Sequence, residues 1–217
     1  MKLVEMTVED FSKEVDSNSP APGGGSVSAL ASNIGVSLAR MMANLSFGKK
    51  KYESLDESIR LEFIDRFNKL GDIRQELILL VDKDTESFEE YMKAIRMPKD
   101  TNEEIQQRKT AIKCAQEFSI EVPFKTASVS MEALELLNYI VKYGNQNAIT
   151  DIGVGTLLIY SGIEGAVLNV KVNLLGLEDE EMINNYTIKC NDLINRASDI
   201  KDEIIGNIHS KLEPIKA

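Results

Sequence analysis

The chain has 217 residues, of which 43% are hydrophobic, so it is long and apolar enough to bury one sizeable core. Only 6% of the residues are aromatic, and this favours helices over a β-sandwich. With 35 acidic and 25 basic residues the net charge is −10, which argues against nucleic-acid binding because that function needs a basic surface. The single histidine, His209, argues against a His-rich zinc site or a histidine-activated nucleophile.

Three further features indicate a cytoplasmic protein without a membrane segment. Cys114 and Cys190 form no CxxC pair, so no disulfide framework is indicated. The first residues lack the basic and apolar regions of a signal peptide. Residues 27–45 form the longest apolar stretch, but they include Arg40 and other polar residues and are too polar to span a bilayer.

Capping residues and helical spacing predict the first helices. Thr7 and Asp10 resemble a capping box and begin a short helix that ends near Asp16. Ser26 is a suitable N-cap for a second helix, which ends at Gly48. One side of this helix is small, so another helix can approach it closely, and we predict that it is the central, buried helix. Its large apolar residues are Leu30, Ile34, Leu38, Met41 and Leu45, and its small side consists of Ala29, Ser32, Val36, Ala39 and Ala43.

The rest of the chain also has helical periodicity. Pro98 ends a long helix over residues 53–96, and Thr101 with Glu104 forms a second capping box. Pro123 is typical of a first helical turn, so we predict that one helix ends near Glu121 and another begins at Pro123. The remaining predicted helices cover residues 101–121, 123–143, 150–174 and 177–212. We therefore predict an all-α antiparallel bundle of five or six main helices in a single domain, residues 1–217.

The only glycine-rich segment is the first candidate site. Gly23, Gly24, Gly25 and Ser26 lie at a helix N-terminus, where unpaired amides can bind a carboxylate or phosphate. No Gly-Lys-Ser/Thr follows, so this is not a nucleotide-binding loop. A plain turn is the alternative, but a turn needs only one glycine, and three glycines favour a ligand that approaches the backbone closely.

Lys49, Lys50 and Lys51 form the only triple-basic run in this acidic chain. They could bind a ligand that carries several carboxylates. The alternative, which charge runs usually favour, is a solvated surface that compensates the dipole at the end of the preceding helix.

Asp84 occupies a core-facing position in the apolar stripe of its helix, between Val81 and Phe88. A buried carboxylate must be paired, hydrogen-bonded or protonated, and perturbed carboxylates serve general acid–base catalysis. A structural ion pair with Arg40 or Arg74 is an equally acceptable interpretation.

Asn145, Asn147, Thr150 and Asp151 surround the start of a later helix. Asn147 or Thr150 can cap this helix, and Asp151 lies in its first turn, where negative charge is favourable. Capping is a sufficient explanation for these residues when no other information is considered.

Four separated motifs, spread over residues 6–175, are specific enough to indicate a family. They are PAPGGGS at residues 20–26 with ANLSFGKKKY at 43–52; DKDTESF at 82–88 with RMPK at 96–99; Val122 with Pro123; and GNQN at 144–147 with Thr150, Asp151 and NVKVN at 169–173. Together they resemble the cyclodeaminase/cyclohydrolase family. This family includes the C-terminal domain of formiminotransferase-cyclodeaminase and free-standing methenyltetrahydrofolate cyclohydrolases.

The resemblance implies an all-α homodimer that uses no metal or redox cofactor and acts on the carbon bridging N5 and N10 of tetrahydrofolate. In cyclodeamination, N10 attacks the carbon of 5-formiminotetrahydrofolate and ammonia leaves, which gives 5,10-methenyltetrahydrofolate. In cyclohydrolysis, water attacks the methenyl compound, which opens to 10-formyltetrahydrofolate. Both reactions need a proton-transfer group and an anion that stabilises the cation, but no nucleophilic residue.

The resemblance also suggests roles for individual residues. Asp84 and Asp151 are candidates for acid–base catalysis and cation stabilisation. Lys50 is a candidate for assisting proton transfer, or for binding the glutamate tail of a folate, which often carries several glutamates, together with Lys49 and Lys51. Gly23, Gly24, Gly25 and Ser26 are expected to bind the pterin or a carboxylate through backbone groups. Asn145 and Asn147 are expected to orient the edge of the pterin through their amides.

Three functions stay open at this point. Similarity to the cyclodeaminase domain favours formiminotetrahydrofolate cyclodeamination, an activity of histidine degradation. The absence of a fused transferase favours methenyltetrahydrofolate cyclohydrolysis. The third function is that of a non-catalytic helical dimer, which would bind a folate or a protein partner and would leave the methenyl absorbance unchanged.

Overall fold

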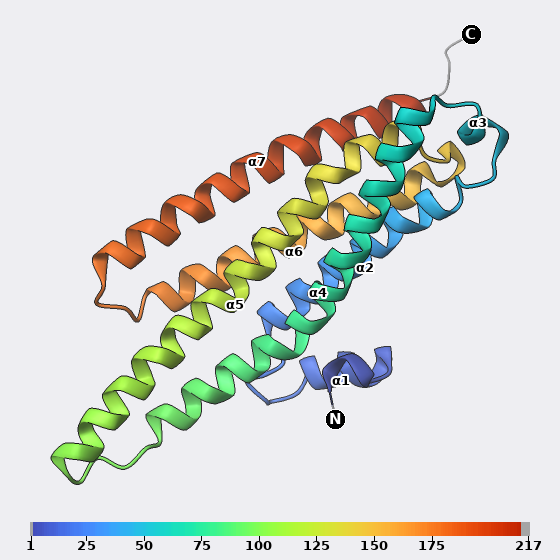
Figure 1. Ribbon diagram of the computed structural model, residues 1–217. Helices are drawn as coiled ribbons and strands as arrows, with labels where there is room; N and C mark the ends of the chain where they lie inside the picture. Colours follow the sequence, from blue (N-terminus) through green and yellow to red (C-terminus); the bar gives the residue numbers. More distant parts are fainter. Residues whose placement is uncertain (1, 214–217) are drawn as a thin grey trace.

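The computed structural model describes residues 2–213. Within them the chain forms five long helices in an antiparallel bundle, with two short helices, two 3-10 turns and no strand (Figure 1). This architecture confirms the predicted all-α class and the number of main helices. The long helices are α2 (Gly24–Asn44), α4 (Glu57–Ile95), α5 (Asn102–Tyr143), α6 (Ile149–Leu174) and α7 (Glu180–Leu212); the short elements are η1 (Leu3–Glu5), α1 (Val8–Val15), α3 (Lys50–Glu53) and η2 (Gln146–Ala148).

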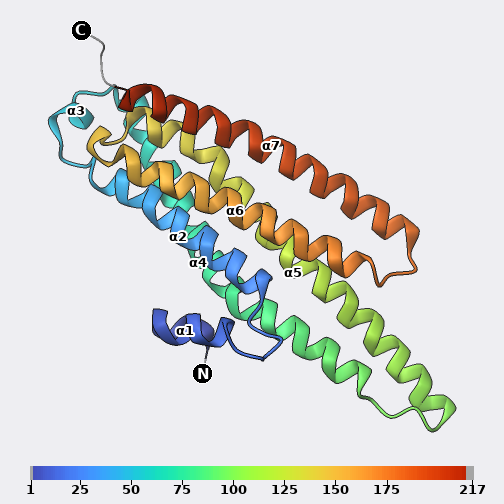
Figure 2. The ribbon, with the colours of Figure 1, turned by 180° about the vertical axis from the view of Figure 1, so that it is seen from behind.

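Helices α2 and α6 lie side by side, and glycines let their backbones meet (Figure 2). A Cβ atom on Gly35 would lie 2.6 Å from the carbonyl oxygen of Gly155, and a Cβ atom on Gly155 would lie 2.7 Å from that of Gly35. Gly162 is equally constrained, because its Cβ atom would lie 2.0 Å from Ser32 Oγ. The predicted close approach of another helix to the small side of α2 is therefore confirmed.

The prediction that α2 is buried is correct only for this small side. Ala29, Val36 and Ala39 are fully buried, but Ile34 in the large apolar stripe is 46% exposed. The other exposed residues of the stripe are Met41 and Leu45, and Val27 extends it towards the N-terminus of the helix. Small residues face the core because α6 packs so closely there, and this leaves the large apolar side of α2 uncovered within one chain.

Helix α5 corrects the prediction that the chain restarts at Pro123. The helix is continuous from Asn102 to Tyr143, with Pro123 in its interior. A proline removes the amide that would bond the carbonyl four residues earlier, here that of Ser119. This carbonyl instead accepts a hydrogen bond from Asn173 Nδ2 of α6 at 2.6 Å. A side chain from another helix thus satisfies the carbonyl that proline leaves free.

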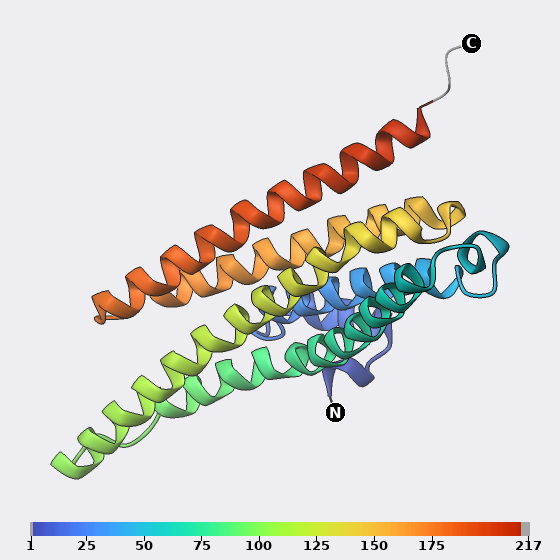
Figure 3. The same ribbon diagram turned by 45° about the horizontal axis from the view of Figure 1, so that its top comes forward.

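Helix α6 is the most apolar part of the bundle. The segment Gln146–Leu174 has the length and mean hydropathy of a membrane-crossing helix, yet half of its apolar window is buried inside the bundle. A helix at the centre of a water-soluble bundle has the same properties, so the composition of α6 agrees with its place beside α2, α5 and α7 (Figure 3).

Candidate active site

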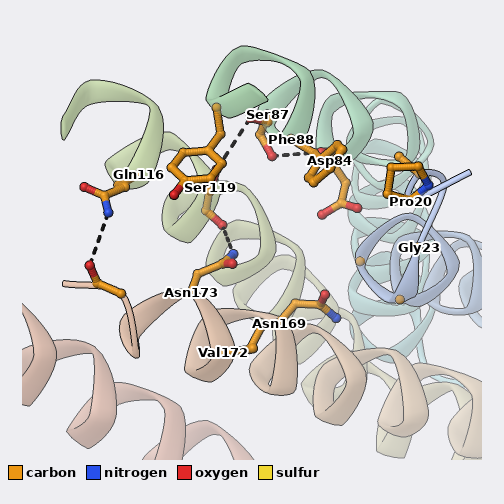
Figure 4. A pocket seen from close by; sticks show the side chains of 15 residues that line it. Pro20, Gly23, Asp84, Ser87, Phe88, Gln116, Ser119, Asn169, Val172 and Asn173 are labelled. Atoms are coloured by element: carbon orange, nitrogen blue, oxygen red, sulfur yellow. Dashed lines mark hydrogen bonds between the residues drawn. The ribbon is translucent and has the colours of Figure 1, made fainter. Parts of the chain in front are cut away.

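A pocket of about 370 Å³ opens where the N-terminus of α2 meets the C-terminal part of α6. Helices α4 and α5 and the segment from Pro20 to Gly25 complete its walls (Figure 4). We call it the Asp84 pocket, because Asp84 is its only ionisable lining residue apart from Tyr91 among residues 2–213. Its volume lies within the range of about 300–1,000 Å³ that is typical of small-molecule sites.

Asp84 caps α2 from the neighbouring helix α4. Its Oδ2 atom accepts a hydrogen bond from the backbone N–H of Ser26 at 2.8 Å and lies 3.2 Å from the Ser26 hydroxyl, which donates to the carbonyl of Val81. The prediction that Ser26 is the N-cap is therefore wrong: the N-cap is Gly23, and Ser26 is the third residue of the helix. Helix amides and the positive end of the helix dipole face the carboxylate, and they offset part of the cost of burying its charge.

Gly25 is a glycine because Asp84 occupies the space that a side chain would need. A Cβ atom on Gly25 would lie 2.0 Å from Asp84 Oδ1 and 2.4 Å from Asp84 Cγ. A Cβ atom on Gly24 would lie 3.1 Å from Asn169 Nδ2. Asp84 therefore explains Gly25 without a ligand, whereas a Cβ atom on Gly23 would lie 3.6 Å from the nearest atom, so the structure gives no such reason for that glycine. The expected ligand contact of this segment stays a prediction.

Asp84 forms no ion pair with a residue in the range 2–213, so of the two interpretations open from the sequence, the ion pair with Arg40 or Arg74 is wrong. Arg40 donates to the carbonyl of Phe67 and stacks 3.9 Å above the Phe67 ring. Burial raises the pKa of Asp84, and the hydrogen bonds from Ser26 lower it by less. The result is a carboxyl group in a pocket that takes up a proton more readily than an ordinary aspartate.

Two asparagines of α6, Asn169 and Asn173, line the Asp84 pocket, and neither is among the site residues expected from the sequence. Asn169 Nδ2 donates to the carbonyl of Gly165 at 2.8 Å, and Asn173 binds Ser119 as described for α5. Their spacing of four residues places both on one side of a helix. Two amides at this spacing near the end of an otherwise apolar helix were the signal that could have identified them.

The other predicted site residues lie at the opposite end of α2. Asp151 is the third residue of α6, so it is roughly 27 Å along that helix from Asn169 at 1.5 Å per residue. Asn145 donates to the carbonyl of Leu45 at 3.0 Å and accepts from the backbone of Asn147 at 3.1 Å, as a structural cap does. The exposed residues Lys49, Lys50 and Lys51 lie in and before α3 at this end as well. Within one chain, none of these residues lines the Asp84 pocket.

The structure thus defines a helical protein with a polar pocket. The pocket combines a carboxyl group of raised pKa, the amides of a helix N-terminus and two asparagine side chains. Among residues 2–213, no three His, Cys, Asp or Glu side chains are grouped as metal ligands.

The sequence profile described as formiminotransferase-cyclodeaminase matches residues 7–192. The chain belongs to this family, as its four motifs predicted.

Individual relatives agree with this assignment. A methenyltetrahydrofolate cyclohydrolase of Methylorubrum extorquens is 32% identical over 206 residues, which are 95% of this chain and 97% of that protein. A formimidoyltransferase-cyclodeaminase of Dictyostelium discoideum is 34% identical over 211 residues, but the match spans only 38% of that longer protein. The solved structure of a formiminotetrahydrofolate cyclodeaminase from Thermotoga maritima has the same fold, with a TM-score of 0.82 at 22% identity over 96% of this chain and 98% of that one.

The contact between Gly25 and Asp84 makes a testable prediction. In the Gly25→Ala variant the new methyl group displaces the Asp84 carboxyl, because the methyl carbon would lie 2.0 Å from Oδ1. If Asp84 is the catalytic carboxyl group, kcat/KM should fall by roughly 10²-fold, the loss that misplacing such a group by about 1 Å produces. The matched control is Gly206→Ala, where a Cβ atom meets nothing within 4 Å. Wild-type turnover in a folded Gly25→Ala protein would contradict the importance of this contact.

Proposed function

We propose that this protein is a folate enzyme that converts 5-formiminotetrahydrofolate to 5,10-methenyltetrahydrofolate and ammonia. The observation that carries the proposal is Asp84, a carboxyl group of raised pKa in a polar pocket of a chain that belongs to this family. The names of its relatives supply the substrate class.

The proposed chemistry uses Asp84 as a proton relay. N10 attacks the formimino carbon and loses its proton, while the departing nitrogen must gain one before it leaves as ammonia. Oδ1 of Asp84 accepts no hydrogen bond from residues 2–213, so it is available to take the first proton and to supply the second. The ionised carboxyl then stabilises the methenyl cation. The reaction has no net redox change, so we propose that it needs no redox cofactor, and we propose the same for a metal because proton transfer and charge stabilisation suffice.

Methenyltetrahydrofolate cyclohydrolysis is the second candidate. The observation that favours it is the end-to-end match with the Methylorubrum extorquens protein, which has nearly the same length. The same groups serve this reaction if Asp84 activates a water molecule and then protonates the departing N5.

One absorbance experiment tests these candidates against each other. The purified protein is mixed separately with 5-formiminotetrahydrofolate and with 5,10-methenyltetrahydrofolate, and the methenyl chromophore is followed against enzyme-free controls. Appearance of the chromophore from the first substrate supports cyclodeamination, and accelerated loss from the second supports cyclohydrolysis. A protein that binds 5-formyltetrahydrofolate but changes neither signal is the non-catalytic dimer, and both proposals then fail.

We further propose that the protein works as a homodimer through the exposed side of α2 and α6. The exposed apolar stripe of α2 has a counterpart on α6, where Leu168 is 62% exposed, and at the C-cap of α6, where Leu175 is 85% exposed. In both helices the stripe repeats at alternating steps of three and four residues, the spacing of helices that pack against other helices. The stripe of α2 consists of Val27, Ala31, Ile34, Leu38, Met41 and the C-cap Leu45; that of α6 consists of Val154, Leu158, Leu168, Val172 and the C-cap Leu175, with the small residues Ser161 and Gly165 at its centre. Apolar patches of this kind mark protein–protein contacts.

A two-fold dimer on this face would join the two separated groups of predicted site residues. A two-fold axis across the helices places the C-terminal end of α2 of one subunit beside the N-terminal end of α2 of the other. Val172 belongs both to the stripe and to the lining of the Asp84 pocket, so the pocket opens at the edge of this face. We therefore propose that Asp151 and Lys50 of the partner subunit complete the pocket, together with the partner's Asn145 and the partner's Asn147.

The same arrangement predicts how the glutamate tail of a folate binds. If Lys49, Lys50 and Lys51 of the partner subunit meet the tail, Lys50→Glu should raise KM more for polyglutamylated folates than for monoglutamates, because only the former place several carboxylates there. The comparison variant is Lys109→Glu, in a second groove beside the Asp84 pocket that also contains Arg108 and Lys113. Equal losses for both tail lengths in Lys50→Glu, or a tail-length effect confined to Lys109→Glu, would contradict this prediction.

A further inference from the structure

Pro123 is the unusual residue of α5, because it lies buried in the interior of a 42-residue helix. Prolines at such positions remove a helical hydrogen bond and commonly break or kink the helix. Nothing in the proposed chemistry uses Pro123 directly, since it does not line the Asp84 pocket. Pro123 can affect the pocket only through the group that it leaves without a helical donor, which is the carbonyl of Ser119.

The carbonyl of Ser119 holds Asn173 in one orientation. Asn173 reaches from α6 towards Ser119, and the distance from its Nδ2 atom to the Ser119 oxygen is 2.6 Å (Figure 4). Because a carbonyl oxygen only accepts hydrogen bonds, the side-chain atom that faces it must be the NH₂ group. The other atom of the amide, Oδ1, accepts no hydrogen bond from residues 2–213, and Asn173 lines the pocket. The amide thus presents a free acceptor at a known place in the pocket wall.

A backbone N–H at position 123 would change this arrangement. It would donate to the Ser119 carbonyl along the helix axis, as every interior amide of an α-helix does. The carbonyl would then turn towards the helix axis and away from the direction of Asn173. Proline removes this donor, and its ring pushes the carbonyl away from the axis. The oxygen instead accepts the hydrogen bond from Asn173 Nδ2.

We infer that Pro123 is a positioning residue of the active site: it reserves the Ser119 carbonyl for Asn173 and so fixes the Asn173 amide in the pocket. This inference rests on the proposed function in one respect, namely that the pocket holds a folate. The pterin ring carries N–H donors, and a fixed acceptor would orient that ring relative to Asp84. Residues at positions 119, 123 and 173 then form one unit, although only Asn173 and Ser119 line the pocket.

The decisive variant is Pro123→Ala. Alanine restores the helical hydrogen bond, so we expect the unfolding temperature to stay equal or rise. We expect kcat/KM to fall about fivefold to tenfold, the effect of one lost hydrogen bond. A purely structural proline would not produce opposite changes in stability and activity. The matched control is Ser128→Ala, which removes another side-chain hydrogen bond to the backbone of α5, from Ser128 to the carbonyl of Phe124, and should leave kcat/KM unchanged.

A double-variant cycle tests whether Pro123 acts through Asn173. If it does, Pro123→Ala combined with Asn173→Ala is no less active than Asn173→Ala by itself, because the positioned group is already absent. Additive losses in the double variant would overturn the inference. If Pro123→Ala does not fold, the Asn173→Asp variant is measured instead. The aspartate carboxylate has nearly the same shape as the asparagine amide but cannot donate a hydrogen bond to the Ser119 carbonyl. Wild-type kcat/KM in Asn173→Asp would therefore also overturn the inference.

An activity-independent measurement separates this inference from the proposed function. In ¹⁵N-labelled protein, the side-chain amide signal of Asn173 is assigned as the one that Asn173→Ala removes. We expect its hydrogens to exchange slowly in the wild type and faster in Pro123→Ala. If the wild type converts neither folate, the proposed function fails while this comparison still decides the positioning. Unchanged exchange of the Asn173 amide in Pro123→Ala would overturn the inference.

Discussion

Asp84→Asn is expected to lower kcat by about 10²- to 10⁴-fold, the range that general acid–base groups contribute. The asparagine oxygen still accepts the hydrogen bond that the backbone of Ser26 donates to Oδ2, so the start of α2 should keep its cap. Only the transferable proton and the negative charge are lost. The measurement is kcat with whichever folate the wild type converts. The matched control is Glu86→Gln, on the same helix but exposed, which should leave kcat unchanged.

Stability should change in the opposite direction from activity. Burial raises the folded-state pKa of Asp84 above its unfolded value, so the folded chain binds this proton more tightly. The resulting stabilisation is fully present below the unfolded pKa and is lost as pH rises through the folded pKa. At neutral pH, Asp84→Asn should therefore unfold at the same or a higher temperature than the wild type, and its stability should depend less on pH. A marked loss of stability at neutral pH, with activity lost in proportion to folded protein, would make Asp84 a structural residue.

The second large effect is expected from mixed dimers. Asp84→Asn and Asp151→Asn should each be nearly inactive by themselves. After subunit exchange in an equal mixture, about a quarter of wild-type turnover should return, because half of the dimers are mixed and each of these contains one intact site. The reason is that the two aspartates of one pocket come from different subunits in the proposed dimer.

The control for this experiment is a mixture of Asp84→Asn with the Asp84→Asn, Asp151→Asn double variant, which contains no intact pocket and should stay inactive. Subunit exchange is verified with two tags of different mass. An exchanged mixture that remains inactive, or a fully active Asp151→Asn protein, would show that Asp151 does not complete the Asp84 pocket. Sedimentation of the wild type as a monomer would contradict the dimer itself.

Much of the fold follows from interactions between near neighbours in sequence. The capping box of Thr101 and Glu104 begins α5 as predicted, and the N-cap Thr7 begins α1. Such signals can be read from a sequence because they depend on side chains three or four residues apart. The prediction that Asp84 faces inwards follows from the same periodicity, since its position belongs to the apolar stripe of α4.

The prediction for α2 was incomplete because periodicity identifies the apolar side of a helix but not the helix that packs against it. The side with large apolar residues is the one that periodicity marks most strongly, yet the core lies on the side with small ones. The contact between Gly35 and Gly155 decides this, and these residues are far apart in sequence. Pro123 was misplaced for the same reason, because the donor that allows it inside α5 comes from α6.

The amino-acid sequence by itself determined the helical class, the family and the presence of a carboxyl group that belongs inside the protein. Local periodicity, capping and motif spacing are sufficient for these conclusions. Only the tertiary structure decided that Asp84 caps α2, that Asn169 and Asn173 line its pocket, and that Asp151 lies at the far end of the bundle. The physical reason is that each of these facts depends on which helices become neighbours, and that choice is made by the close packing of whole helices rather than by any one segment.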